Sequence, residues 1–234
     1  MNSIEKYGKI GEHNQMFKNL SLICTLLLLA TIGCASTEVG FERRKSFNPN
    51  TKKVVTMAIF DMSTNATGAS DDESNKVFSS IAQTEVGNIY GSLIPGGDLT
   101  VKAAEGLGIK GELDKAMGKL TEAIVNSNSI DPKTTEIFAK IADKIGVEAL
   151  AFPLVSGTKD AMASDRGLTY RFAVYDVKDA GIQYVAQIDS VSVNSFIYEK
   201  SDANQKKALI SGAATKAVNS LFTKVKEELA KTKK

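Results

Sequence analysis

Residues 131–157 read DPKTTEIFAKIADKIGVEALAFPLVSG, and this stretch decides the fold. Asp131 followed by proline is typical of a helix start, because the carboxylate can accept hydrogen bonds from free amides of the first turn and proline is tolerated there. Apolar residues then recur at three- and four-residue spacing as far as Ile145, and Gly146 suits the left-handed turn that ends a helix. The apolar run at 147–157 predicts a strand buried on both faces.

Further segments have the pattern of strands. Residues 53–61, KVVTMAIFD, form a continuous apolar run rich in Val and Ile. Residues 168–177 and 182–196 alternate in polarity on either side of the connection KDAG, which predicts an antiparallel hairpin. A short strand is also predicted at 99–103. Pro153 lacks a backbone N–H and therefore predicts a strand end, a bulge or an edge at its position.

Amphipathic helices are predicted where apolar residues repeat along one face, at 78–93, 113–124 and 201–231. A polar loop precedes the first of them, and its carboxylates Asp71 and Asp72 are candidate helix caps rather than a proton-sharing pair. Together these segments predict one α/β (α+β) domain of two or three layers. It contains a mixed sheet of about four to five strands with flanking helices.

The first 33 residues have the pattern of an export signal. No charge occurs between Lys18 and Gly33, and this run is shorter than the roughly 20 apolar residues that a membrane-spanning helix needs. Its length fits the apolar region of a secretory signal, with a basic residue before it and a small residue at the cleavage position. A start at Met16 gives a more typical layout than the first methionine. We therefore expect residues 1–33 to be a signal peptide.

A small residue followed by Cys34 at the end of a short apolar region resembles the lipobox of bacterial lipoproteins. The resemblance implies that Cys34 carries acyl chains such as palmitate, becomes the first residue of the mature chain and binds membrane lipid. Ala35 resembles the residue found in outer-membrane-sorted lipoproteins, so we expect the cell outer membrane, with the domain facing the periplasm or the cell surface. Residues 34–52 are polar and contain Asn-Pro, which predicts a flexible tether reaching about 20–25 Å.

Cleavage after residue 33 removes His13 and Cys24. The mature chain of 201 residues then has no His or Trp, and its one cysteine is Cys34. Zinc sites built from His and Cys, and nucleophiles activated by His, are excluded. The mature side chains comprise 26 basic and 25 acidic groups, which gives no indication of nucleic-acid binding. We predict no catalytic residue, no metal site and no cofactor.

Two short motifs also fail as signs of an enzyme. Gly106, Gly108 and Gly111 have the spacing of a dinucleotide fingerprint, but no second strand ending in an acid follows them, so they predict a flexible loop. Ser156 and Lys159 spell S-x-x-K, the spacing of serine and lysine in penicillin-recognising enzymes. They follow a predicted strand, however, and the partner motifs are missing downstream.

The stretches VVTMAIFDMSTNA, IADKIGVEALAFPLVSG and YRFAVYDVKDAGIQYVAQ, followed by a C-terminal helix, carry a resemblance. They are similar to the small α/β domain shared by CsgG-type curli secretion lipoproteins, LpoB-type penicillin-binding-protein activators and the TolB amino-terminal domain. The similarity covers the predicted domain, 53–231, almost to its end. The chain departs from the pattern in KDAG, which lacks the usual Thr, and in a helical insertion around 105–128.

This resemblance implies binding rather than catalysis. The leading hypothesis is a lipid-anchored, non-catalytic adaptor or regulator of an envelope protein complex, with a protein partner or self-association. One alternative is an oligomeric secretion-channel subunit, which would contribute two membrane-spanning hairpins. Only the hairpin at 168–196 has a comparable length, and its face of Tyr170, Phe172 and Val174 is equally well explained by packing on helices. A surface-exposed adhesin is the second alternative.

Overall fold

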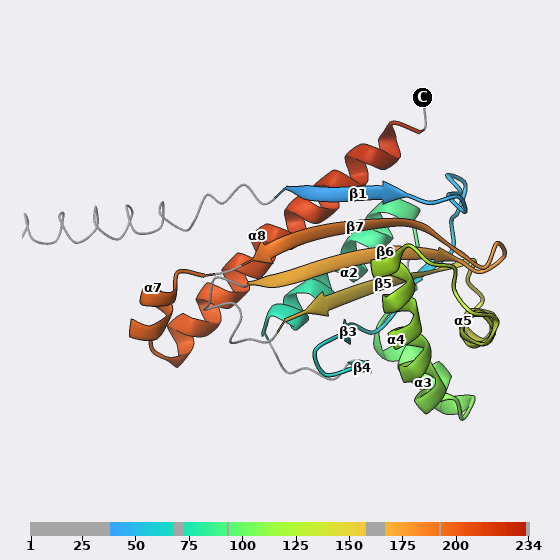
Figure 1. Ribbon diagram of the computed structural model, residues 1–234, viewed down its shortest axis with the longest axis horizontal. Coiled ribbons are helices and arrows are strands. Elements are labelled where there is room, and N and C mark those ends of the chain that lie inside the picture. The colour runs from blue at the N-terminus through green and yellow to red at the C-terminus, as the bar shows by residue number, and fades with distance from the viewer. Residues whose placement is uncertain (1–37, 68–72, 93, 158–166, 192, 233–234) are drawn as a thin grey trace, which may run out of the picture. The chain divides into compact units, whose positions relative to one another are not determined.

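The computed structural model describes residues 38–67, 73–92, 94–157, 167–191 and 193–232. They form one mixed sheet with helices on both faces (Figure 1), which confirms the predicted class. The sheet order is β1-β7-β6-β5-β3-β4, and β2 also pairs with β5. Its seven strands exceed the predicted four to five. They are β1 Val39–Arg43, β2 Val54–Thr56, β3 Phe60–Asp61, β4 Ala66–Thr67, β5 Ala149–Ser156, β6 Leu168–Asp176 and β7 Gly181–Val191.

Strand β5 is the strand around which the sheet is built. It runs parallel to β2 and β3 on one side and antiparallel to β6 on the other. All of its residues before Ser156 are buried. Its side chains alternate between two separate hydrophobic cores, Ala149 and Val155 on one face and Leu150 and Phe152 on the other. The prediction of a strand buried on both faces is confirmed.

Pro153 lies inside β5 without ending it, contrary to the prediction. The amide of Met57 donates to Ala151 O and that of Met62 to Val155 O, each at 2.8 Å. Backbone groups alternate in direction along a strand, so the backbone nitrogen of Pro153, like the carbonyls of Ala151 and Val155, points toward β2 and β3. The gap between β2 and β3 lies opposite it, so the missing N–H removes no ladder bond. The run predicted as one strand therefore forms two short ones.

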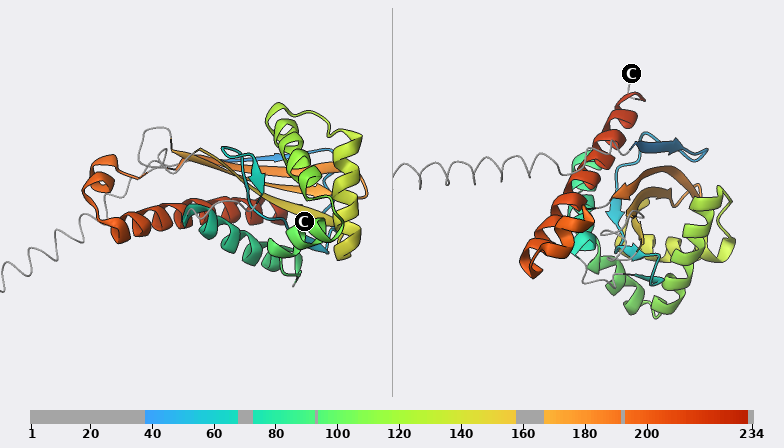
Figure 2. Two further views of the ribbon diagram at one scale, coloured as in Figure 1. Left: turned by 90° about the horizontal axis from the view of Figure 1, so that it is seen from below. Right: turned by 60° about the vertical axis from the view of Figure 1, so that its left-hand side comes forward.

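Two helices cover the first face of the sheet, α2 Glu73–Tyr90 and α8 Ala203–Ala230 (Figure 2). They enclose a core in which Phe78 packs edge-on against Tyr170 with ring centroids 5.1 Å apart, and Phe172 against Phe222 at 4.8 Å. Val174 is buried in the same core. The face of β6 that was equally consistent with membrane insertion or helix packing is thus packed against helices.

Three helices cover part of the second face. They are α3 Asp98–Gly106, α4 Lys110–Asn126 and α5 Pro132–Ile145. Asp131 caps α5 and Gly146, at φ 83°, ends it as predicted. The helices stand over the half of the sheet near the β6–β7 turn and leave the other half of this face without a helix (Figures 1 and 2).

The short strand predicted at 99–103 is wrong, because these residues lie in α3. A helix places Thr100, Ala103 and Ala104 on one face, and all three are buried. The loop predicted from Gly106, Gly108 and Gly111 is also wrong. Gly106 ends α3, Gly111 lies in α4, and Gly108, at φ 70°, makes the short turn between them.

The predicted tether is wrong from Val39 onward, because β1 is an edge strand of the sheet. It pairs antiparallel with β7, from Val39 opposite Ile188 to Arg43 opposite Tyr184. The polar chain that follows is held by hydrogen bonds between buried groups. Gln183 Nε2 donates to Thr51 Oγ1 at 2.8 Å and to Asp176 Oδ2 at 3.0 Å, and Thr51, Gln183 and Asp176 are all buried.

The hairpin and the last helix follow the prediction, but the segment that connects them differs from it. Strand β7 ends at Val191, and the last two residues of the predicted strand instead begin helix α7, Ser195–Lys200. Asn194 accounts for the change, because its side chain accepts a hydrogen bond from the amide of Ile197 and so starts a helix. Helix α8 then begins with a capping box of Asp202 and Gln205.

The cap of α5 provides a test of stability. Asp131 accepts hydrogen bonds from Thr134 N at 3.1 Å and Thr134 Oγ1 at 2.7 Å, which lower the pKa of its carboxyl. Replacing Asp131→Ala should reduce the free energy of unfolding in urea by about 1 kcal/mol. The control Asp143→Ala, an exposed carboxylate within the same helix, should change it by less than about 0.5 kcal/mol.

The pH dependence of this cap has a defined sign. Because the pKa of Asp131 is lower in the folded state, its contribution is complete above the unfolded pKa of about 4 and is lost as pH falls through the lower folded pKa. The difference between wild type and Asp131→Ala should shrink in that acid range. Equal destabilisation by both alanine variants at neutral pH would contradict the role of the cap.

Candidate functional site

Most of the residues singled out in the sequence cannot be compared in the described structure. Cys34, Asp71, Asp72 and Lys159 lie outside the described residues. Ser156 ends β5, and its hydroxyl accepts a hydrogen bond from Arg171 Nη1 at 3.1 Å. Two other features of the described part of the chain are candidates for function: the fixed start of the domain at β1 and an uncovered half of the sheet.

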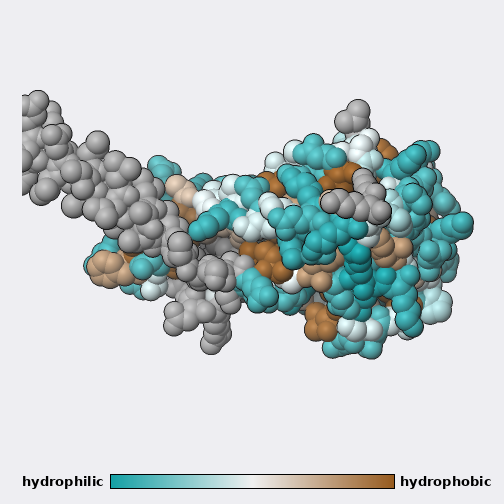
Figure 3. Space-filling model, turned by 90° about the horizontal axis from the view of Figure 1, so that it is seen from above, coloured by the Kyte–Doolittle hydropathy of each residue, from teal (hydrophilic) through white to brown (hydrophobic). Residues whose placement is uncertain are grey.

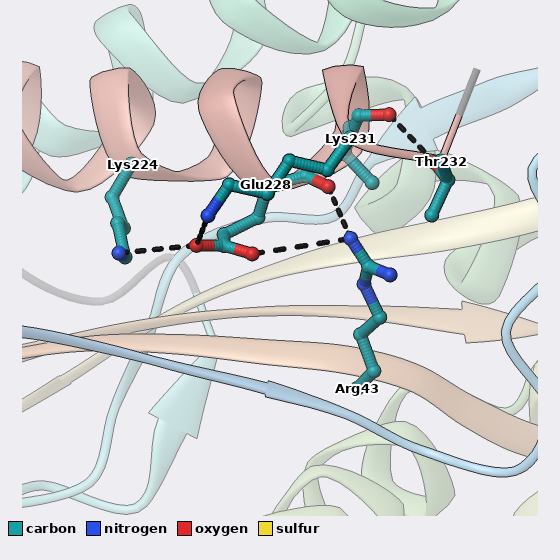
Figure 4. Close-up of polar contacts among 6 residues, drawn as sticks. Arg43, Lys224, Glu228, Lys231 and Thr232 are labelled. Carbon is teal, nitrogen blue, oxygen red and sulfur yellow. Dashed lines mark hydrogen bonds and ion pairs between the residues drawn. The ribbon is translucent and has the colours of Figure 1, made fainter. Parts of the chain in front are cut away.

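The start of the domain is clamped to the end of α8 by charge (Figure 4). Arg43, at the end of β1, donates a hydrogen bond to the backbone carbonyl of Glu228 and lies 3.9 Å from its carboxylate. Lys231 and Lys224 approach the same carboxylate at 2.6 Å and 3.1 Å. Hydrogen bonds from Lys231 and then Lys224 lower the pKa of Glu228, so the group stays ionised at neutral pH.

Aromatic side chains hold the same segment on the first face of the sheet. Phe41 of β1 stacks on Tyr184 with centroids 5.2 Å apart, and Phe47 packs against Tyr184 at 6.4 Å. The guanidinium of Arg43 lies over the ring of Phe47 at 5.1 Å. The hydroxyl of Tyr184 is 2.8 Å from that of Tyr90, and burial raises the pKa of both. The chain therefore enters the folded domain at β1.

At the end far from the β6–β7 turn, none of the described helices covers the second face of the sheet (Figure 1). Five polar residues from three adjacent strands lie on this part of the sheet, which we term the open half-face. Their positions alternate with buried apolar residues that point to the first face, such as Tyr170 and Ile188. The open half-face consists of Ser156 from β5, Thr169 and Arg171 from β6, and Gln187 and Asp189 from β7.

A continuous hydrogen-bonded row crosses the open half-face. Arg171 donates from Nη1 to Ser156 and from Nε to Gln187 Oε1 at 2.5 Å. Gln187 Nε2 in turn donates to Asp189 Oδ2 at 2.6 Å. Burial lowers the pKa of Arg171, and the charge of Asp189 acts in the opposite direction. An arginine remains charged at neutral pH, so the row presents a fixed cation beside an exposed carboxylate.

The sequence contains a signal for this row. Arg171 is the one charged residue within the apolar part of its strand, YRFAVY. It alternates with Tyr170 and Phe172, so it must face away from the core that they enter. Its partners Gln187 and Asp189 lie on the next strand of the predicted hairpin. A lone charge at an alternate position of a buried strand thus indicates where a sheet face is open.

A shallow groove of about 620 Å³ lies between the start of β1 and α8. Its lining has a mixed character of two glutamates, two lysines, one valine and uncharged polar groups. These residues are Glu38, Val39, Lys216, Asn219, Ser220, Thr223, Lys224 and Glu227. The groove is broadly open to solvent and offers hydrogen bonding without an enclosed space for a small ligand.

The described ranges contain neither a grouped set of metal ligands nor a membrane-spanning helix. Within them, no three side chains of His, Cys, Asp or Glu are grouped as metal ligands would be. None of the helices in the part of the chain that the structure describes combines the length and apolar character needed to cross a bilayer.

The chain has remote structural likenesses to two kinds of solved protein. No protein-family model and no curated protein matches the chain. The LpoB C-terminal domain from Escherichia coli is similar with a TM-score of 0.34 and 12% identity, over 59% of this chain and 82% of that one. A PelC dodecamer variant from Paraburkholderia phytofirmans gives 0.31 and 11%, over 76% and 96%. Likenesses of this size carry no argument about function.

The clamp on β1 can be tested by hydrogen exchange. The Arg43→Ala change removes the contacts to Glu228 and to Phe47, so the amides of β1 should exchange about tenfold faster. The Glu228→Gln change leaves the backbone carbonyl in place and should have a smaller effect. The control Lys119→Ala breaks an exposed pair with Glu122 on α4 and should leave β1 unchanged. Exchange of β1 at the wild-type rate in Arg43→Ala would contradict the clamp.

Proposed function

We propose that this chain is a lipid-anchored, non-catalytic envelope protein that binds a protein partner through the open half-face. In this proposal Cys34 carries the acyl chains in the cell outer membrane, and the domain faces the periplasm or the cell surface. It acts as an adaptor or regulator of an envelope complex. The observation that carries the proposal is the hydrogen-bonded row of Arg171 on a sheet face that no helix of the described chain covers.

The open half-face has the properties of a protein-binding surface. Strand β6 is paired on both sides and β7 is paired on both sides as far as Ile188, and their other face is packed against helices, so the backbone beneath Arg171 and Gln187 is well supported. The side chains of Arg171 and Gln187 are held by each other, which reduces the entropy lost when a partner orders them. Arginine is also enriched in protein interfaces, where it combines a charge with a broad contact surface.

The packing of the hairpin favours an adaptor over a channel subunit. Tyr170, Phe172 and Val174 are buried in the core beneath α2 and α8. Inserting this hairpin into a membrane would require those side chains to leave that core. A surface adhesin would use the same anchor and a different partner, and the partner captured at the open half-face distinguishes it from a regulator.

Site-specific photocrosslinking in cells tests the proposal. A photoreactive residue in place of Asp189, which is exposed on the open half-face, should give one defined crosslinked species. The matched control in place of Glu122, exposed on α4, should not. Expressing excess unlabelled wild-type chain should compete the adduct away, whereas the Arg171→Glu chain should compete about tenfold less well, since it loses the fixed cation.

Two results would contradict the proposal. Equal crosslinking at both positions, or equal competition by wild type and Arg171→Glu, would show that the open half-face is not the binding surface. The anchor is tested separately by intact mass and fractionation. The wild-type chain should carry acyl mass and sediment with membranes, and Cys34→Ala should lose both properties.

A further inference from the structure

The turn from β7 into α8 forms an ordered arm without a core of its own. We term residues 194–209 the elbow; it contains α7 and the first part of α8. Helix α7 has no buried residue, and the first buried residue of α8 is Ile210. The elbow is held by the caps at Asn194 and Asp202, by a 4.0 Å ion pair between Lys207 and Glu73, and by half-buried Tyr198, which packs against the first core. Most of its other side chains are exposed in the described structure.

The elbow also carries the most exposed large apolar side chain in the described ranges. Phe196 is 68% exposed, compared with 55% for Val125 and 38% for Leu107. In the space-filling view, moderately hydrophobic side chains gather at the left end of the described surface, where Figure 1 places α7 (Figure 3). A single exposed apolar residue is common on protein surfaces. The exposure of Phe196 therefore indicates a contact surface only if its place in the fold supports one.

The register of β1 fixes that position relative to the chain's entry point. Val39 is opposite Ile188, and β7 continues to Val191. Three further residues of strand extend β7 about 10 Å beyond Val39, in the direction from which the chain enters the sheet. The elbow follows at that same end of the domain (Figure 1). The elbow, which contains Phe196, thus lies at the end of the domain from which the described chain enters β1.

Chain length then limits how far the domain can be from an attachment at Cys34. Only residues 35–37 separate Cys34 from Glu38, so even a fully extended backbone spans at most about 14 Å between them. This span is comparable to the distance by which β7 extends past Val39. A leaflet that holds acylated Cys34 would therefore lie within reach of the elbow.

We infer that Phe196 and the adjoining lysines of the elbow contact the lipid leaflet that holds Cys34 and so fix the orientation of the domain on the membrane. This inference rests on the lipid anchor of the proposed function. An aromatic side chain flanked by lysines suits the lipid interface, where the ring enters the acyl boundary and ammonium groups meet phosphates. Lys200 and Lys207 are exposed, and the ammonium of Lys206 lies 5.1 Å from the ring centre of Tyr198.

The absence of tryptophan from the sequence allows a direct test. The Phe196→Trp variant places a single fluorophore in the elbow, and Val125→Trp is the matched control. Val125 is also exposed, but it follows Ile124, whose carbonyl accepts a hydrogen bond from Arg44 beyond the opposite end of β1. Both variants are purified as the lipidated full-length protein and reconstituted into vesicles of phosphatidylethanolamine and phosphatidylglycerol with brominated acyl chains.

Emission from Phe196→Trp should shift to shorter wavelength and be quenched about threefold by the brominated lipids, because bromine quenches only a ring within the acyl boundary. Emission from Val125→Trp should change little. Equal or absent quenching in the two variants, with the protein still floating with the vesicles, would overturn the inference and leave the anchor standing. An emission shift of Phe196→Trp that occurs only when envelope protein is added would assign the elbow to a protein partner. That result would also overturn the inference of lipid contact.

Failure of the anchor has a different signature. If wild-type protein carries no acyl mass and does not float with vesicles, the lipid attachment in the proposed function fails. Binding at the open half-face is measured by crosslinking and does not depend on Phe196. The two proposals can thus fail separately.

Discussion

The pairing of β1 with β7 is the constraint on which the organisation of this protein depends. Five residues that look like part of a linker form an edge strand, and Phe41, Phe47 and Arg43 attach that strand to Tyr184 and Glu228. In the sequence, residues 35–37 separate Cys34 from Glu38, and the sheet begins at Val39. The predicted tether of 34–52 is therefore part of the folded domain from Val39 onward.

The second consequence concerns the two faces of the sheet. The apolar residues of β5, β6 and β7 require helices on both sides, and α2 with α8 cover the first face completely enough to bury Tyr170 and Phe172. On the second face α3, α4 and α5 cover only the part near the β6–β7 turn (Figure 2). The sequence changes from apolar to polar at the boundary, where Ser156, Arg171 and Gln187 replace the residues that a helix would cover. The same sheet is therefore a core at one end and a surface at the other.

The sequence predicted the elements whose stabilisation is local or strongly periodic. The α5–β5 unit follows from the cap at Asp131, the turn at Gly146 and an apolar run, all of which are local signals. Strand β1 could not be recognised, because it offers only two apolar side chains and depends on contacts more than 140 residues away in the chain. Pro153 was misinterpreted for a related reason. Its missing donor faces a break in the partner strand, a feature of pairing rather than of the strand itself.

Limited proteolysis of the full-length chain by trypsin tests the place of β1 most directly. Arg43, Arg44 and Lys45 would all be readily cut in a flexible tether, and cleavage there would release the domain from the residues before it. Since β1 is paired with β7 and clamped to α8, these bonds should be cut about a hundredfold more slowly than in a peptide of the same sequence, until the domain unfolds. Release of the domain at the peptide's rate, with the new N-terminus within residues 44–46, would contradict the account.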